Sequence, residues 1–121
     1  MLSCLFVALG GAVGSVARYL IGLIKLNDSA VFPIKTLAIN IIGSFLIGLI
    51  VALSVKSSDL DPQLVLFLKV GVCGGFTTFS TFALESVELF GSGRPGAAVL
   101  YVLLSVLGSA AAILLAQAAV R

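Results

Sequence analysis

Long apolar runs separated by short polar or proline-containing turns make up most of the chain. Four such runs cover approximately residues 2–24, 34–55, 62–90 and 96–120. A membrane-spanning helix needs roughly 20 consecutive apolar residues. The first, second and fourth runs have that length, whereas the third is too long for one straight helix. The pattern predicts an all-α integral membrane protein with four transmembrane helices, in which residues 1–121 form a single transmembrane domain.

The third run contains the least helix-like stretch of the chain, Gly-Gly-Phe-Thr-Thr-Phe-Ser-Thr-Phe at residues 74–82. Adjacent glycines and hydroxyl residues disfavour a continuous helix. In lipid, the backbone groups that a helix break frees must be satisfied by protein, water or an ion. A break at membrane depth therefore usually lines a cavity or a binding site. We expect the glycine-rich interruption to break the third helix, and the functional site to lie at that break.

Composition narrows the function classes further. The chain is 60% hydrophobic and only 10% charged, whereas soluble domains carry roughly 25% charged residues. We expect no soluble domain and no cleavable leader, because no basic segment precedes the first run. Cys4 and Cys73 are expected to be buried thiols. The chain has no histidine, which excludes an imidazole relay, and no nucleophile–base pair or metal-ligating set that would indicate an enzyme.

Basic residues are nearly balanced across the expected membrane. With four spans, both termini and the loop at 56–61 share one side, and the loops at 25–33 and 91–95 share the other. The two sides carry about three and four basic residues, namely Lys56, Lys69 and Arg121 against Arg18, Lys25, Lys35 and Arg94. Orientation follows an asymmetry of Lys and Arg, so we expect insertion in both orientations. Two inverted copies would then form an antiparallel, dual-topology homodimer, which gives a small chain enough interior for a pathway.

Polar side chains inside the spans are candidates for lining a pathway. Asn40 lies in the second span and either makes an interhelical hydrogen bond or lines a pathway, because a buried unpartnered amide costs about 4–8 kcal/mol on a cyclohexane scale. Tyr101, Ser105 and Ser109 recur at every fourth position of the fourth span and share one helical face. The serines either bond to carbonyls of their own helix or form a polar track with the tyrosine.

Charged and aromatic residues give a second set of candidates. Arg18, near the end of the first span, can extend to the lipid headgroups, and Glu85, deeper in the third span than Glu88, needs a donor or water. Phe79 and Phe82 share a helical face and either fill space or present positive ring edges to an anion. Hydroxyl and amide donors without a cluster of basic side chains favour a small, strongly hydrated anion.

Three sequence motifs occur in order along the chain: GGAVGSVARY at 10–19, TLAINIIGSF at 36–45 and GVCGGFTTFSTF at 71–82. Together they resemble the CrcB/Fluc family of fluoride channels, and the resemblance extends over all four spans. It implies a dual-topology homodimer with two antiparallel pores, which exports fluoride passively across the cytoplasmic membrane of a prokaryote and protects the cell from fluoride toxicity. It also implies a structural sodium ion at the dimer centre.

The resemblance further implies which residues form the pore. The side chains that would line it are Asn40, Phe79, Ser80, Thr81, Phe82, Tyr101, Ser105 and Ser109. In this set Asn40 would donate to fluoride, and the two phenylalanines would form an aromatic ladder with the same pair of the second copy. The main-chain carbonyls of Gly74 and Thr77 would hold the sodium ion. Arg18 and Glu85 also match positions typical of the family.

Two other classes of membrane protein compete with a fluoride channel. A small four-span antiparallel multidrug exporter uses a carboxylate in its first span and aromatic tryptophan surfaces, and this chain has neither. A purely structural membrane subunit would explain the glycines but not the broken third span or the hydroxyl stripe of the fourth. The expected partners are fluoride, an inverted second copy and the lipid bilayer, with no nucleic acid.

Overall fold

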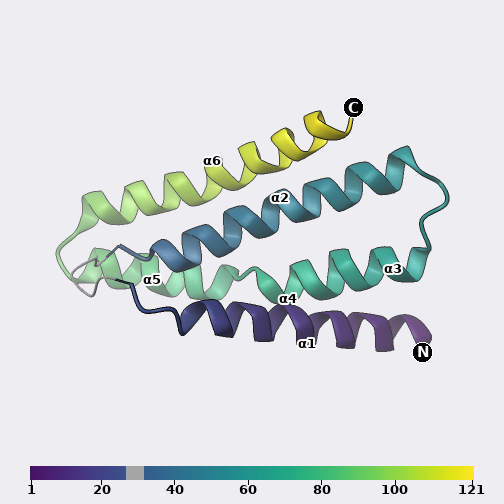
Figure 1. Ribbon diagram of the computed structural model, residues 1–121. Coiled ribbons are helices and arrows are strands. Elements are labelled where there is room, and N and C mark those ends of the chain that lie inside the picture. Colours follow the sequence, from purple (N-terminus) through teal and green to yellow (C-terminus); the bar gives the residue numbers. More distant parts are fainter. Residues whose placement is uncertain (27–31) are drawn as a thin grey trace.

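Four long helical segments lie side by side in the computed structural model, which describes residues 1–26 and 32–121 (Figure 1). The elements in chain order are α1 (Leu2–Gly22), α2 (Ile34–Lys56), α3 (Pro62–Leu66), the π-helix η1 (Phe67–Cys73), α4 (Gly74–Phe76), α5 (Phe79–Gly91) and α6 (Pro95–Val120). The described residues contain no strand. All four segments are long and apolar enough to cross a membrane. The predicted all-helical fold with a broken third segment is therefore confirmed.

The third segment, from α3 to α5, contacts each of the other three helices. Helix α1 lies along α3, η1 and α4, and α2 contacts η1, α4 and α5. Helix α6 packs along α2 and also contacts α5. Figure 1 shows both termini at the same end of the bundle, beside the turn that joins α2 to α3. The helical segments begin and end within two residues of the apolar runs in the sequence. This arrangement places the middle of the third segment between α1 and α2.

The surface of the bundle is apolar and its helix contacts are small. Leu107 is 64% exposed and Leu114 is 66% exposed, whereas Ala112 and Ala116 on the same helix are 6% and 0% exposed. A methyl group added to Gly48 of α2 would lie 3.0 Å from the Cα atom of Ile113. Close backbone approach through small residues is the packing mode of helices in lipid. The outward leucines are therefore suited to contact acyl chains.

A glycine seam joins α1 to the third segment. A Cβ atom built on Gly71 would lie 2.7 Å from the Cα atom of Gly10, and one built on Gly75 would lie 2.6 Å from the carbonyl oxygen of Gly11. Real Cβ atoms do not approach backbone atoms so closely. The two segments can thus touch backbone to backbone only because glycine has no side chain.

The glycines of the third segment do not themselves form the break. Gly74 and Gly75 are helical residues of α4, and the chain leaves the helix at Thr77 and Thr78, directly after them. Gly75 serves the glycine seam instead. The π-helix η1 was also not expected from the sequence. Such wide turns are usually short and frequently occur at functional sites, and only the short α4 separates this one from the break.

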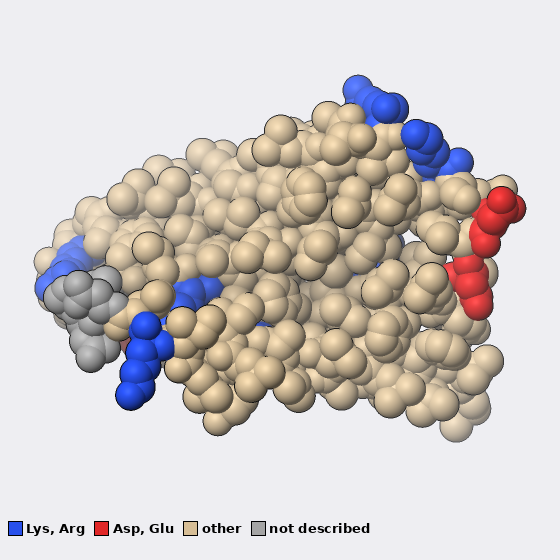
Figure 2. All heavy atoms as spheres, viewed as in Figure 1, with Lys and Arg blue, Asp and Glu red and all other residues tan. Residues whose placement is uncertain are grey.

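Polar side chains fix the ends of the helical segments. Asp61 accepts a hydrogen bond from the Gln63 N–H at 2.9 Å and caps α3, whose first residue is Pro62. Lys35 Nζ donates to the Gly22 carbonyl at 2.9 Å. Lys56 Nζ donates to the Val120 carbonyl at 2.8 Å. These lysines compensate the negative ends of α1 and α6, and Figure 2 shows basic side chains at both ends of the bundle.

Replacing Gly10 with alanine tests the glycine seam. The new methyl group would lie 2.8 Å from the Cα atom of Gly71, so we expect Gly10→Ala to lower the unfolding free energy by roughly 1–3 kcal/mol. Gly11→Ala is the matched control, because a methyl group there meets nothing within 4 Å. Thermal unfolding in detergent compares the two variants. Equal melting temperatures would contradict the seam.

Candidate functional site

The helix break is held by a side chain from the neighbouring helix α2. Thr77 and Thr78 have extended backbones. The Thr78 N–H donates to Asn40 Oδ1 at 2.8 Å, and Asn40 Nδ2 donates to the Thr78 carbonyl at 3.0 Å. The amide thus satisfies one donor and one acceptor freed by the break. Asn40 makes an interhelical hydrogen bond, and its second Nδ2–H remains for another acceptor.

Two carbonyls at the break lose the donors they would have in a continuous helix. A helical N–H bonds the carbonyl four residues earlier, so the Gly74 carbonyl would accept from Thr78 and the Thr77 carbonyl from Thr81. The Thr78 N–H instead bonds Asn40. The Thr81 N–H instead bonds Thr78 Oγ1 at 3.3 Å, which caps α5. Both carbonyls that the family resemblance assigns to a sodium ion are therefore released from helical pairing.

The Arg18 side chain also contacts the break. Its Nε atom donates to the Gly75 carbonyl at 3.2 Å, and the contact is half-buried. This contact differs from the expected extension to the headgroups. A carbonyl next to a helix break can lack a helical donor, and the guanidinium supplies one from α1. Arg18 and Asn40 consequently hold the break from opposite neighbours.

A cavity of about 350 Å³, which we term the break cavity, adjoins this arrangement. Its lining comes from α2, η1, α4, the break, α5 and α6 and comprises Asn40, Gly43, Ser44, Ile47, Cys73, Gly74, Thr77, Thr78, Phe79, Phe82, Ser105, Val106 and Ser109. This set contains no charged side chain. The cavity thus brings together Asn40, both phenylalanines and two of the three serines of the predicted pore, Ser105 and Ser109, with the two predicted carbonyl positions.

Ser105 places a buried hydroxyl group beside the break cavity. The residue is 6% exposed, and its Oγ atom has no hydrogen-bond partner among the described residues. Leaving a buried hydroxyl unpaired costs about 1–3 kcal/mol. Its expected alternative, a bond back to its own helix, is not observed. The hydroxyl is therefore available to donate to a ligand in the cavity.

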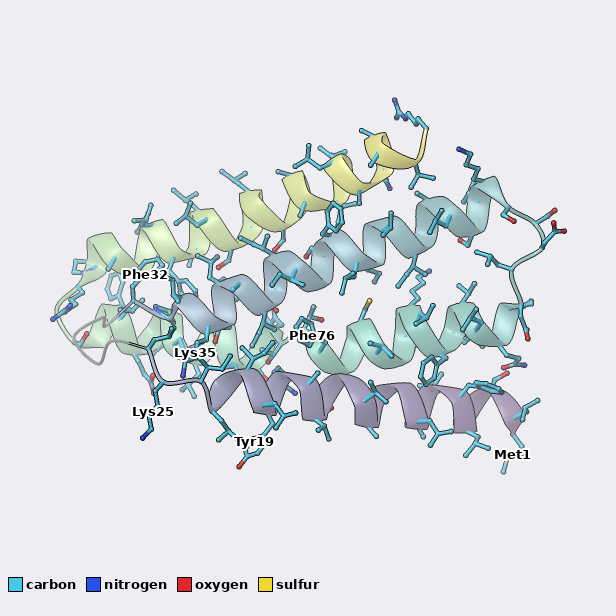
Figure 3. All side chains as sticks on the ribbon, viewed as in Figure 1. Met1, Tyr19, Lys25, Phe32, Lys35 and Phe76 are labelled. Carbon is cyan, nitrogen blue, oxygen red and sulfur yellow. The ribbon has the colours of Figure 1, made fainter. Side chains whose placement is uncertain are left out.

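Aromatic rings form a continuous row beside the break cavity. The ring centres of Phe79 and Phe82 are 5.7 Å apart. Phe82 and Tyr101 are 5.3 Å apart, and Tyr101 and Phe32 are 5.6 Å apart in an edge-to-face arrangement. Phe79, at the other end of the row, is 79% exposed. The third phenylalanine of the motif, Phe76, is buried and points toward α2 instead (Figure 3).

The hydroxyl stripe of α6 is divided between two surroundings. Ser105 and Ser109 line the break cavity, but Tyr101 does not. Tyr101 is fully buried, and its hydroxyl donates to Glu85 Oε1 at 3.1 Å. The donor that Glu85 needs in the third segment is thus the tyrosine of α6. Phe82 contacts Tyr101 and lines the cavity, so it connects the two parts of the stripe.

Two predicted pore residues lie outside the break cavity. Ser80 is exposed on α5, and Thr81 is half-buried there. Neither lines the cavity. A second, larger cavity of about 610 Å³ lies beside Lys25, Lys35 and Glu85, at the end of the bundle where α1 ends and α2 begins. Glu85 lines this cavity together with charged side chains and also bonds Tyr101, so it connects the aromatic row to the second cavity.

Sequence reasoning missed several residues of the site. Thr78 supplies the backbone pair of Asn40 and the cap of α5, and Ser44 lines the cavity. Ser44 follows Asn40 by four positions and shares its helical face, which is a signal that could have found it. Thr78 gave no such signal, because its role depends on contacts with another helix. Among the described residues no three His, Cys, Asp or Glu side chains gather.

Comparisons with known proteins bear on this geometry. A family profile described as "CrcB-like protein, Camphor Resistance (CrcB)" matches residues 5–117. A protein of Agrobacterium fabrum is 47% identical over 114 residues, which cover 93% of this chain and 91% of that protein. A Cereibacter sphaeroides protein is 48% identical over 122 residues, with 98% and 94% covered. One from Shewanella halifaxensis is 49% identical over 107 residues, with 88% and 86% covered. All three are named fluoride-specific ion channel FluC.

Proposed function

This chain belongs to the CrcB-like family, and from that premise we propose that it is a multi-pass membrane protein that acts as a fluoride-selective ion channel. Its matched relatives are named fluoride-specific ion channels, and its four apolar segments have the length of membrane spans. We further propose that it works in the cytoplasmic membrane of a prokaryote, lets fluoride leave passively and protects the cell from fluoride toxicity. The relatives bear the names of channels rather than enzymes, and we propose no catalytic activity.

The observation that carries this function is the Ser105 hydroxyl, which finds no hydrogen-bond partner in the described part of the chain and adjoins a cavity whose lining contains no charged side chain. Fluoride is small and strongly hydrated, so it needs donors that replace its water shell. Ser105, Ser109 and the free Nδ2–H of Asn40 are neutral donors, and the rings of Phe79 and Phe82 can offer positive edges. Conduction requires binding that is strong enough for entry and weak enough for release. Several neutral donors meet both needs.

A second copy of the chain in inverted orientation would complete the pore. Phe79 is 79% exposed although it lines the break cavity, and the hydroxyl residue Ser80 beside it is exposed as well. A partner surface would cover both groups. Basic side chains at both ends of the bundle favour insertion in both orientations (Figure 2). We therefore propose an antiparallel homodimer in which Phe79 and Phe82 of both copies form the aromatic ladder, with Ser80 and Thr81 close to the pore.

A sodium ion at the dimer centre fits the residues of the break. The Gly74 and Thr77 carbonyls have lost their helical donors to Asn40 and Thr78. Hard cations prefer oxygen ligands such as main-chain carbonyls. Two carbonyls from each of two copies would supply a shell without any acidic side chain. When bound, the ion supplies a fixed positive charge that lowers the cost of moving an anion through low dielectric.

The alternative class, a small multidrug exporter, lacks support. The α1 segment carries no carboxylate and the chain has no tryptophan. The matched relatives bear the name of fluoride channels. A passive channel also differs from an exporter in needing no proton gradient, which makes the two classes separable by experiment.

Fluoride efflux from liposomes tests the proposed function directly. We expect purified protein to release fluoride without a proton gradient and to release no chloride. Ser105→Ala should slow fluoride efflux roughly tenfold or more, because it removes a donor to a charged ligand. Ser54→Ala is the matched control, since Ser54 bonds its own helix at 2.8 Å and lies outside the cavity. Chloride efflux at a comparable rate would overturn the proposal.

Isoleucine substitutions test the aromatic ladder. Phe79→Ile and Phe82→Ile keep apolar bulk but remove the positive ring edge, so we expect each to reduce fluoride efflux at least tenfold, about 1.4 kcal/mol of barrier. Phe90→Ile on the same helix is the control, because Phe90 is 63% exposed and lies outside the break cavity. Size-exclusion chromatography checks assembly. Near-normal efflux through both ladder variants would show that the rings only fill space.

Added charges test the inverted pairing. About two or three lysines placed in the loop at 25–33, of which residues 27–31 lie outside the described part, should force one orientation. That variant alone is expected to lose efflux, and co-expression with a variant carrying lysines in the loop at 57–61 should restore it. Accessibility of engineered cysteines from each side measures orientation. Full efflux from a population with one proven orientation would exclude the antiparallel dimer.

A further inference from the structure

Several backbone N–H and carbonyl groups at the break form hydrogen bonds with specific side chains. The carbonyl of Gly75 accepts from Arg18, and the carbonyl of Thr78 accepts from Asn40. The carbonyls of Gly74 and Thr77 each directly precede one of these two carbonyls in the sequence. Their helical donors are held elsewhere, one by Asn40 Oδ1 at 2.8 Å and one by Thr78 Oγ1 at 3.3 Å. Two side-chain oxygens thus determine which carbonyls stay open.

We propose that Asn40 and the Thr78 side chain are positioning residues for a cation at the break. By binding the Thr78 and Thr81 N–H groups, they prevent these donors from returning to the Gly74 and Thr77 carbonyls. The inference rests on the proposed sodium ion and extends it to the side chains that keep its ligands free. Neither side chain needs to touch the ion itself.

The physical reason is the lack of competing acceptors in lipid. A backbone N–H at membrane depth must find an acceptor within the protein. If Asn40 Oδ1 is removed, the nearest acceptor for the Thr78 N–H along the chain is the Gly74 carbonyl, four residues earlier. If Thr78 Oγ1 is removed, the Thr81 N–H has the Thr77 carbonyl in the same relation. Loss of either oxygen would extend a helix into the break and occupy a cation ligand.

Asn40 would then join the cation site to the anion pathway. Its Oδ1 atom acts on the Gly74 carbonyl through the Thr78 N–H, while its side chain also lines the break cavity. The Arg18 guanidinium further limits which carbonyls can bind the ion, because it donates to the Gly75 carbonyl and keeps that oxygen from the ion. A change at Asn40 is therefore expected to alter both cation affinity and anion flux, whereas a change at Ser105 should alter anion flux alone.

A sodium titration of thermal stability tests the proposal without relying on flux. The melting temperature of the purified full chain is measured in detergent as sodium chloride replaces N-methylglucamine chloride at constant ionic strength. The variants are Asn40→Leu and Thr78→Val, each close in size to the residue it replaces. Thr78→Ser keeps the hydroxyl and Ser105→Ala keeps the break contacts, so both are controls. Outer-shell partners of a metal typically contribute 10- to 100-fold in affinity.

We expect the sodium concentration at half-maximal stabilisation to rise roughly 10- to 100-fold in Asn40→Leu and Thr78→Val, and to stay at the wild-type value in both controls. A wild-type midpoint in Thr78→Val overturns the proposal, and this near-isosteric variant decides the matter if Asn40→Leu does not fold. If sodium does not stabilise the wild-type protein, both this inference and the proposed sodium site are overturned. Fluoride efflux from the same preparation then shows separately whether the channel function stands.

Discussion

The fold depends on the requirement that every backbone polar group at membrane depth finds a partner. The third segment interrupts its helical hydrogen bonds at Thr77 and Thr78, where the backbone is extended. The side-chain amide of Asn40 compensates, because it bonds both the N–H and the carbonyl of Thr78. Because Asn40 lies on α2, the break can exist only where α2 is close. The place of the break and the open Gly74 carbonyl follow from this pair, whereas the Thr78 hydroxyl caps α5 and leaves the Thr77 carbonyl open.

Small residues make that closeness possible on both sides of the third segment. Gly10 and Gly71 bring α1 into backbone contact with η1. On the opposite side, Gly43 of α2 leaves room for the Thr77 methyl group, which a Cβ atom at that position would overlap, and for the Phe76 ring at 3.3 Å. The break is therefore fixed in space although it lacks regular hydrogen bonds. A cavity lined by neutral donors can then keep its shape while an anion enters and leaves, which a channel requires.

The sequence allowed the number of helices, their bounds and the approximate place of the break to be predicted, because apolar run length and helix-poor residues are local signals. It did not indicate that Gly74 and Gly75 would remain helical, nor that Gly75 would serve the close contact with α1. The contact of Arg18 with the Gly75 carbonyl and the division of the hydroxyl stripe at Tyr101 were missed as well. Each depends on which helices become neighbours.

We propose that each copy holds half of a pore, which an inverted second copy completes at the break cavity. An experimentally determined structure of the protein in lipid nanodiscs with sodium fluoride tests this proposal most directly. We expect two copies related by a two-fold axis in the membrane plane, with the exposed Phe79 ring of each facing a pore that contains Ser105. Two copies in the same orientation, or a Phe79 ring that faces only lipid, would contradict it.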